Sequence, residues 1–303
     1  MYSTKASLIG VTACAFLAGC STFSQSSSPS PSLQQSNSRK IAQSLQFPAT
    51  QLVRDVSGPK KIYVANCSGF NLTTYTAKKG APTNPTIPSQ NLGYCPEDVA
   101  VDSKGKIYVV GGFESLYTFK PNGKPTTPTI SLDEDLLGVA VDANGKIYIT
   151  SFGAVQTFEA NGAPTTPTIT GFISARGIAV DASGKIYVVD QAEGTVTTYA
   201  PDGTPTTPTI TGLSSPAGVA VDANFKIYVV QQGLGEVTTY ASDGTPAGPT
   251  ISGLTTPWFV AVSALGDIYV TANNTVTTYN AQGKQIKPTI TVGLNQPIGL
   301  ALH

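Results

Sequence analysis

The sequence predicts an all-β fold, a six-bladed β-propeller, from its composition, one internal repeat and the chemistry of its turns. Gly (30 residues) and Pro (22 residues) are abundant and only 12% of residues are charged, which suits short strands and tight turns. A phrase centred on K-I-Y-V recurs at intervals of 39 to 45 residues, starting at Lys61, Lys106, Lys146, Lys185, Lys226 and Asp267. Four short strands fit each interval, which is the content of one propeller blade.

Each repeat contains four strands in a fixed order, and the fifth copy shows them clearly: Gly218–Asp222, Lys226–Val229, Val237–Tyr240 and Pro249–Ile251. The first two strands are apolar at consecutive positions, so we expect neighbouring blades to cover both faces of each sheet. A turn of the form D-x-x-G-K separates these two strands, and Asn-Gly or Asp-Gly separates the last two. The tyrosines of the I-Y-V segments recur once per blade and are predicted to be core residues.

Closure of the ring depends on a strand at the end of the chain. The first repeat, around Lys61, lacks a clear G-V-A-V-D segment, whereas Gly299–His303 supplies a spare one. We therefore predict that the C-terminal strand completes the first blade. The six first strands would then start at Asp98, Gly138, Gly177, Gly218, Phe259 and Gly299. Leu52–Val56 is the alternative partner and stays open from the sequence.

The N-terminus reads as an export signal. A basic start (Met1–Lys5) precedes a mostly apolar run (Ala6–Ala18) that is too short to span a bilayer, where about 20 apolar residues are needed. Leu17-Ala18-Gly19-Cys20 resembles the lipobox of bacterial lipoproteins. The resemblance implies a signal peptide over residues 1–19 and acylation of Cys20, with several acyl chains (palmitate or similar) giving stable membrane attachment.

Residues 20–50 are predicted to be a flexible tether behind the lipidated cysteine, because they are rich in Ser, Pro and Gln and poor in apolar side chains. The propeller is expected over residues 51–303. The predicted location is extracytoplasmic, lipid-anchored to a bacterial membrane. Ser21 is not the aspartate that tends to retain lipoproteins in the inner membrane, so we expect the outer membrane if the host has one.

The repeated unit G-[VI]-A-V-D-x-x-G-K-I-Y-V with a following V-T-T-Y resembles the NHL repeat, over about residues 52–303. The resemblance implies a six-bladed propeller of the superfamily that includes gluconolactonase-like enzymes and virginiamycin B lyases. It specifies the fold and leaves the function open, because such propellers include lactonases, lyases, protein-binding modules and lipoproteins.

Cys67 and Cys95 both fall in loops on one face of the predicted propeller. Export would allow a disulfide between them to persist, and the loop it closes would make it worth about 3 kcal/mol. Two free thiols or a metal pair are the alternatives.

Histidine chemistry is excluded by the sequence, because His303 is the only histidine and is the final residue. Virginiamycin B lyase and peptide-amidating lyase, similar propellers, rely on histidine, so their catalytic residues are not matched here. No catalytic residue and no cofactor are predicted. The resemblance to gluconolactonases implies a divalent metal, Ca²⁺ for example, for which Glu97, Asp190 and Asn295 are weak candidates.

One residue per blade, just before each predicted first strand, is expected at the mouth of the central channel: Glu97, Leu137, Arg176, Ala217, Trp258 and Ile298. Glu97, Arg176 and Trp258 depart from a small or aliphatic ring and are the candidate ligand mouth, able to hold an anionic or sugar-like ligand. In the alternative interpretation the two charges are solvated and Trp258 packs on Pro257. Nearby loops add polar and aromatic side chains: Phe113, Glu114, Asp133, Glu134, Asp135, Phe152, Gln191, Gln231, Gln232, Asn273 and Asn274.

These observations favour a membrane-anchored binding or scaffold module, monomeric and non-enzymatic. The partners would be the membrane, through the lipid, and an envelope protein or glycan. Nucleic acid is not expected, because 18 basic and 18 acidic side chains balance. The alternatives are a metal-dependent lactonase or similar hydrolase, and a structural or adhesive envelope protein that uses its Thr-rich blade edges.

Overall fold

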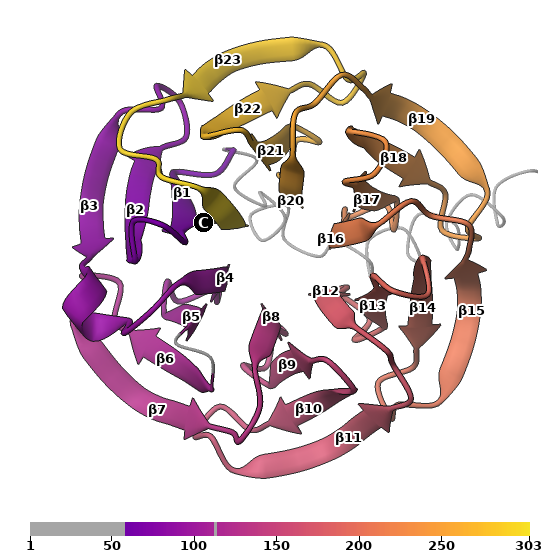
Figure 1. The fold of residues 1–303 in the computed structure, drawn as a ribbon, viewed down its shortest axis with the longest axis horizontal. Coiled ribbons are helices and arrows are strands. Elements are labelled where there is room, and N and C mark those ends of the chain that lie inside the picture. The colour runs from indigo at the N-terminus through magenta and orange to yellow at the C-terminus, as the bar shows by residue number, and fades with distance from the viewer. Residues whose placement is uncertain (1–57, 112–113) are drawn as a thin grey trace, which may run out of the picture. The chain divides into compact units, whose positions relative to one another are not determined.

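The computed structural model describes residues 58–111 and 114–303, which form six four-stranded antiparallel sheets arranged around one axis (Figure 1). A short 3₁₀ helix at Ser89–Asn91 (η1) is the helical element in these residues. The predicted six-bladed β-propeller is confirmed. The predicted signal peptide (1–19), Cys20, the tether (20–50), the segment Leu52–Val56 and Phe113 lie outside the described residues.

The strands of each blade run from the axis to the rim in the predicted order. The first strands, nearest the axis, are β4 (Pro96–Val101), β8 (Leu136–Val141), β12 (Ala175–Val180), β16 (Pro216–Val221), β20 (Pro257–Val262) and β24 (Pro297–Leu302). The second strands are β1 (Lys61–Asn66), β5 (Ile107–Gly111), β9 (Ile147–Ser151), β13 (Ile186–Asp190), β17 (Ile227–Gln231) and β21 (Ile268–Ala272).

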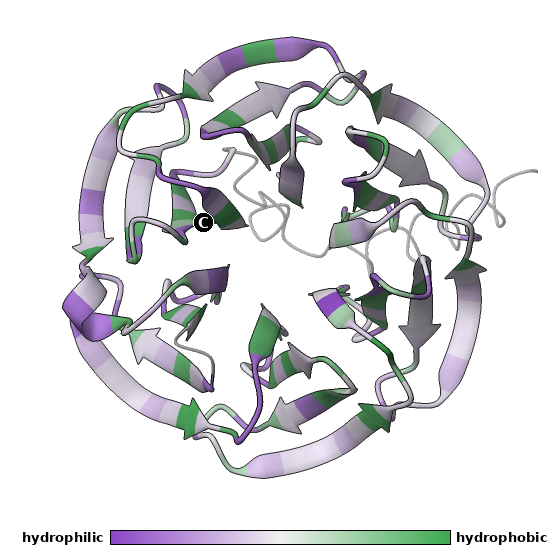
Figure 2. Cartoon of the chain, in the orientation of Figure 1, coloured by the Kyte–Doolittle hydropathy of each residue, from purple (hydrophilic) through white to green (hydrophobic). Residues whose placement is uncertain are grey.

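The outer half of each blade consists of a third strand and a rim strand. The third strands are β2 (Asn71–Thr76), β6 (Ser115–Phe119), β10 (Ala154–Phe158), β14 (Thr195–Tyr199), β18 (Glu236–Tyr240) and β22 (Thr275–Tyr279). The rim strands are β3 (Pro82–Ile87), β7 (Pro125–Ser131), β11 (Pro164–Thr170), β15 (Pro205–Ile210), β19 (Pro246–Ile251) and β23 (Gln285–Ile290). Figure 2 shows that the rim strands are mostly polar, as predicted for the blade edges.

Each first strand begins two residues earlier than predicted, at Pro96 in β4 and Ala175 in β12 for example. The pairing continues past a shift in register: Pro96 pairs with Gly111, whereas Asp98 pairs with Val110. The six residues expected at the mouth of the channel therefore lie inside the first strands, at this shift in register, and not before the strands: Glu97, Leu137, Arg176, Ala217, Trp258 and Ile298. Such bulges redirect a side chain relative to the sheet.

The ring closes through the C-terminal strand, as predicted. The first sheet has the order β24-β1-β2-β3, with Tyr63 opposite Ala301. The backbone of His303 extends the pairing, since its carbonyl accepts the Lys61 N–H at 2.8 Å and its own N–H donates to the Lys61 carbonyl at 3.1 Å. The two ends of the described chain are therefore held in one sheet.

The core consists of six apolar clusters, each shared by two adjacent blades. One cluster joins Tyr63 and Leu72 of the first blade to Val99 and Ile107 of the next. The I-Y-V tyrosines are buried, as predicted: Tyr63, Tyr108, Tyr148, Tyr187, Tyr228 and Tyr269. Several of their hydroxyls donate to the aspartate of the D-x-x-G-K turn, for example Tyr187 to Asp181 at 3.0 Å.

Glycines let the first strands of adjacent blades approach closely at the axis. A Cβ added to Gly177 would lie 2.4 Å from the Ala217 carbonyl oxygen, and one added to Gly138 would lie 2.3 Å from the Arg176 carbonyl oxygen. Neither backbone can move without disturbing its own blade. The glycine of G-[VI]-A-V-D, which four of the six first strands carry, therefore permits this close packing between blades, whereas the other two strands have Asp98 and Phe259 at this position.

Replacement of Gly177 by Ala tests this contact. Gly177→Ala should lower the free energy of unfolding by about 1 to 3 kcal/mol, because the new methyl group overlaps a main-chain oxygen. Gly153→Ala is the matched control, since nothing lies within 4 Å of its added Cβ. Urea unfolding of both variants measures the difference. Equal unfolding midpoints would contradict the close approach.

The buried tyrosines predict a loss of stability at alkaline pH. Burial and the Asp142 carboxylate raise the pKa of Tyr148 to about 12, and burial followed by Asp267 raises that of Tyr269 to about 12. In the unfolded chain both tyrosines have a pKa of about 10. The unfolded chain therefore releases these protons first, and the contribution of the two tyrosines to the free energy of unfolding, which is constant below about pH 10, should fall between about pH 10 and 12.

Thermal melting over this pH range checks the tyrosine prediction. Tyr148→Phe removes one of the titrating groups and should make the alkaline decline shallower. A melting temperature that stays constant up to about pH 12 would show that these hydroxyls are not buried as described.

Candidate functional site

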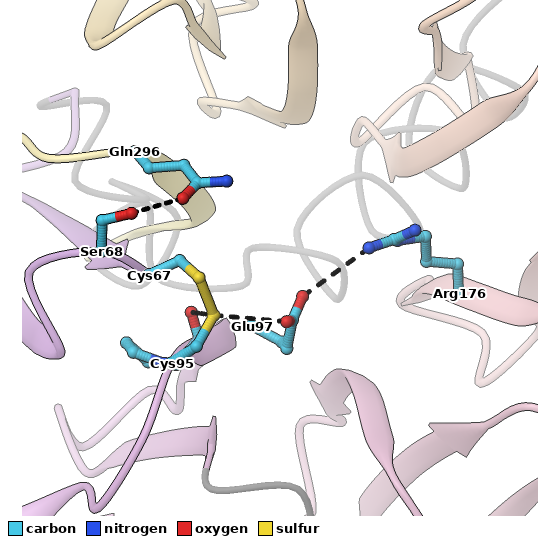
Figure 3. Close-up of a disulfide and its surroundings, with 7 residues drawn as sticks. Cys67, Ser68, Cys95, Glu97, Arg176 and Gln296 are labelled. Atoms are coloured by element: carbon cyan, nitrogen blue, oxygen red, sulfur yellow. Dashed lines mark hydrogen bonds and ion pairs between the residues drawn. A yellow bond between two sulfur atoms is a disulfide. The ribbon is translucent and has the colours of Figure 1, made fainter.

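The candidate site lies on the mouth face, which we define as the face formed by the loops between second and third strands and the loops leading into first strands. Glu97, Arg176 and Trp258 come from β4, β12 and β20, which belong to alternate blades. Arg176 Nη2 lies 3.7 Å from Glu97 Oε2, and the Arg176 guanidinium lies 4.9 Å from the centre of the Trp258 ring. Figure 3 shows Glu97 and Arg176 pointing toward each other across the axis. The three predicted mouth residues are therefore brought together.

Partial burial sets the electrostatics of the charged pair. Their side chains are 26% (Glu97) and 20% (Arg176) exposed. Burial raises the pKa of Glu97, Arg176 opposes this rise, and Asp135 adds to it. Burial likewise lowers the pKa of Arg176, which Glu97 counteracts. Because water still reaches both groups, the ion pair contributes about 0 to 1 kcal/mol, and its main effect is to fix the position of the guanidinium.

Arg176 is also held by groups on its own blade and on neighbouring blades. Its Nη1 donates to Gln191 Oε1 at 3.0 Å, and Gln191 in turn donates to Gln232 Oε1 at 3.2 Å. The Thr150 hydroxyl donates to the Arg176 carbonyl oxygen at 2.6 Å. Arg176 therefore connects four blades and cannot be treated as a freely solvated charge. The predicted loop residues Gln191 and Gln232 belong to this network.

The Cys67–Cys95 disulfide is confirmed, and it borders the site. It joins the end of β1 to the residue before β4, so it links the first two blades on the mouth face. The Glu97 carboxylate lies 3.3 Å from the Cys95 sulfur. Figure 3 shows the disulfide beside Glu97. Oxidation excludes both cysteines as thiolate metal ligands, although Cys67, Cys95 and Glu97 lie within 4.8 Å of one another.

A cavity of about 390 Å³ opens on the other side of Trp258, between the last blade and the blade closed by β24. We call it the amide basin, because four side-chain amides line it together with two hydroxyls, an indole and a proline: Asn273, Asn274, Asn295, Gln296, Ser68, Thr256, Trp258 and Pro297. As far as the described residues show, its lining contains no charged side chain.

The loop at Asn295 and Gln296, which forms one wall of the amide basin, is held from both sides. The buried Asn66 accepts the Asn295 N–H at 3.1 Å, and Asn274 accepts the Gln296 N–H at 2.7 Å. The Gln296 carbonyl accepts the Cys67 N–H at 3.0 Å, and the Ser68 hydroxyl donates to Gln296 Oε1 at 2.5 Å. The basin is therefore shaped before any ligand arrives.

A second, more apolar cavity of about 210 Å³ lies beside Glu97 and includes Tyr94, Leu137 and Phe152. Exposed large apolar side chains are concentrated on this face. Among the described residues, six of the eight lie in mouth-face loops: Phe70, Tyr94, Phe152, Ile173, Leu234 and Val292. Six separate loops of the mouth face therefore each expose one large apolar side chain.

The three candidate metal ligands have separate surroundings. The buried Asp190 carboxylate accepts backbone N–H groups of its own neighbourhood, from Ile173 at 2.8 Å and Ser174 at 3.1 Å, and also from Ala192 and Glu193 at 3.2 Å each. Glu97 faces Arg176, and Asn295 lines the amide basin. Asp190 therefore orders the loops around it, and a metal site shared by the three residues stays a prediction.

The other predicted loop residues divide between structure and site. Gln231 is buried and accepts the Ser214 N–H at 2.8 Å, so it is structural. Glu134 accepts a hydrogen bond from Gln156, whereas Asp135 borders the apolar cavity. Two important residues were missed from the sequence. Asn66 ends β1, and Asp98 replaces the repeat glycine, its buried carboxylate accepting the Val139 N–H of the next blade at 3.0 Å.

Comparisons with known proteins support the fold. No protein-family model matches the sequence, and no curated protein matches it. A crystal structure of a protein of unknown function from Bacteroides caccae has a TM-score of 0.68 at 12% identity, over 80% of this chain and 98% of that one. A nidogen/laminin complex chain has a TM-score of 0.67 at 18% identity, over 80% and 97%.

The virginiamycin B lyase of Staphylococcus aureus, crystallised with quinupristin, has a TM-score of 0.60 at 13% identity, over 82% of this chain and 89% of that one. These likenesses place the chain among six-bladed β-propellers and show the fold alone. In the described part of the chain, no helix has the length and apolar character needed to cross a membrane.

The ion pair at the mouth predicts a pKa change in Glu97. Arg176→Met removes the neighbouring charge and keeps the aliphatic packing, so the pKa of Glu97, already raised by burial, should rise further. Titration of the Glu97 carboxyl carbon by NMR measures it. Lys104→Met on the opposite face is the control. An unchanged Glu97 pKa in Arg176→Met would mean that the two side chains are not in contact.

Proposed function

We propose that this protein is a lipid-anchored, extracytoplasmic binding module whose mouth face captures a ligand. The propeller would act as a rigid scaffold for that face, and the N-terminal segment would hold it to the membrane. This function needs no catalytic residue, consistent with a chain whose single histidine is its last residue.

The convergence of Glu97, Arg176 and Trp258 carries the binding proposal. Three alternate blades each direct one large side chain to the axis, whereas the blades between them carry Leu137, Ala217 and Ile298 at this position. Tryptophan and arginine are the residues that most often dominate binding energy at interfaces. Propellers of similar fold occur in a nidogen/laminin complex and with bound quinupristin, so a ligand on this scaffold has precedent.

The anchoring proposal rests on the N-terminal sequence. Leu17-Ala18-Gly19-Cys20 has the lipobox pattern, and residues 20–50 have the composition of a tether. Acyl chains on Cys20 would hold the module on the membrane surface, in the outer membrane where the host has one.

Lipidation is tested by expressing the full chain with labelled palmitate. Cys20→Ser should abolish the label and move the protein from the membrane fraction to the soluble fraction. Cys14→Ser, in the apolar run, is the control and should change neither. A label retained by the Cys20→Ser variant would refute the anchor.

Binding is tested with the chain carrying Cys20→Ser, so that lipid does not contribute. Its association with isolated cell envelopes of the producing organism should fall about tenfold or more in Trp258→Ala and in Arg176→Ala, as expected for central interface residues. Asn144→Ala, exposed on the opposite face, should bind like the parent chain. Equal binding by all variants would refute a role for the mouth.

A further inference from the structure

We propose that the amide basin binds an uncharged saccharide, with Trp258 as its aromatic contact. This inference rests on the proposed function, because it assigns a ligand class to the mouth face.

The lining of the amide basin matches the chemistry of a sugar. Side-chain amides offer a donor and an acceptor each, and the Ser68 and Thr256 hydroxyls offer both as well. A pyranose presents alternating hydroxyl donors and acceptors around an apolar ring face. An indole such as that of Trp258 supplies an apolar surface with a polar edge. Among the described residues, no carboxylate, ammonium or guanidinium lines the cavity, so an uncharged ligand fits it best.

Hydrogen-bonding capacity in the amide basin is left unused by the protein. The Asn273 and Asn295 side chains make no hydrogen bond to the rest of the described chain. Asn274 uses its oxygen on the Gln296 N–H, and Gln296 uses its oxygen on Ser68, so both keep their NH₂ groups. Two complete amides and two further NH₂ groups are therefore available around one cavity.

The backbone of the amide basin is rich in non-glycine residues with positive φ. Seven non-glycine residues of the described chain have positive φ, and four of them line this cavity: Thr256 (φ 44°), Asn273 (41°), Asn274 (58°) and Gln296 (50°). Such conformations cost energy and are concentrated at binding sites, where they fix the direction of side chains. Asn66 and Asn274 also accept the main-chain N–H groups of Asn295 and Gln296, so the backbone that carries the amides is ordered before binding, which reduces the entropy lost on association.

Two other ligand classes fit the site less well. An anion would be drawn to Arg176, which does not line the basin and is already paired with Glu97. A protein partner would use the apolar cavity at Tyr94 and Phe152, which lies beside Glu97 and apart from the amides. The amide basin itself is lined mostly by uncharged polar side chains, which suits a saccharide.

The single tryptophan of the chain makes the test direct, since every change in indole emission comes from Trp258. The chain carrying Cys20→Ser is titrated with neutral trisaccharides of glucose (α- and β-linked), galactose, mannose, xylose and N-acetylglucosamine. Trigalacturonate serves as the anionic probe. Asn273→Asp and Asn295→Asp keep the shape of the side chain and remove its donors, and Asn144→Asp on the opposite face is the matched control.

We expect saturable changes in Trp258 emission with at least one neutral trisaccharide, weakened about tenfold by Asn273→Asp or Asn295→Asp and unchanged by Asn144→Asp. Thermal melting of each variant shows that it is folded. The saccharide assignment would be overturned if no probe changes the emission or if only trigalacturonate does. It would also be overturned if both basin variants bind the neutral trisaccharide as well as the parent chain does. If envelope binding still depends on Trp258 in that case, the proposed function stands and only the saccharide assignment fails. If neither envelope binding nor a saccharide response depends on the mouth face, both proposals are refuted.

Discussion

The pairing of β24 with β1 is the interaction on which the other features of this propeller depend. It joins the C-terminal strand to the first blade and closes the ring. The same pairing brings the loop before β24 against the loop after β1, so that Gln296 contacts Cys67 and Ser68. The Cys67–Cys95 disulfide then secures this blade to the next. The pairing that closes the ring therefore also builds this part of the mouth face.

Alternate blades contribute the large side chains of the mouth face. Glycines in four of the six first strands allow close contact at the axis, and a bulge in each first strand directs one side chain per blade toward the mouth. Where that side chain is large, at Glu97, Arg176 and Trp258, it reaches across to the others. A rigid, repetitive scaffold thus presents a few exceptional residues, which is how propellers acquire specificity without altering their blades.

The sequence predicted the blades and the closing strand, because the repeats can be counted. It also predicted the three mouth residues, which depart from the residues at the same position of other repeats, and the disulfide, whose two cysteines fall in loops on one face. It did not predict the amide basin. That cavity combines Thr256 and Asn273 of one blade with Ser68 and Asn295 of the next, and closure of the ring brings these loops side by side. Asp190 was assigned to chemistry because its environment was unknown, although four backbone N–H groups satisfy it. Asp98 could have been noticed, since it stands where four of the other five repeats have glycine.

The most direct test of this account is the chain that ends at Gln296, without β24, compared with the full chain by thermal unfolding followed through Trp258 emission. Because removal of β24 exposes the edge of β1, we expect the melting temperature to fall by tens of degrees or the cooperative transition to be lost. Trp258 emission should shift toward that of the unfolded chain. An unchanged transition and an unchanged emission spectrum would contradict it, because the ring would then close without the C-terminal strand.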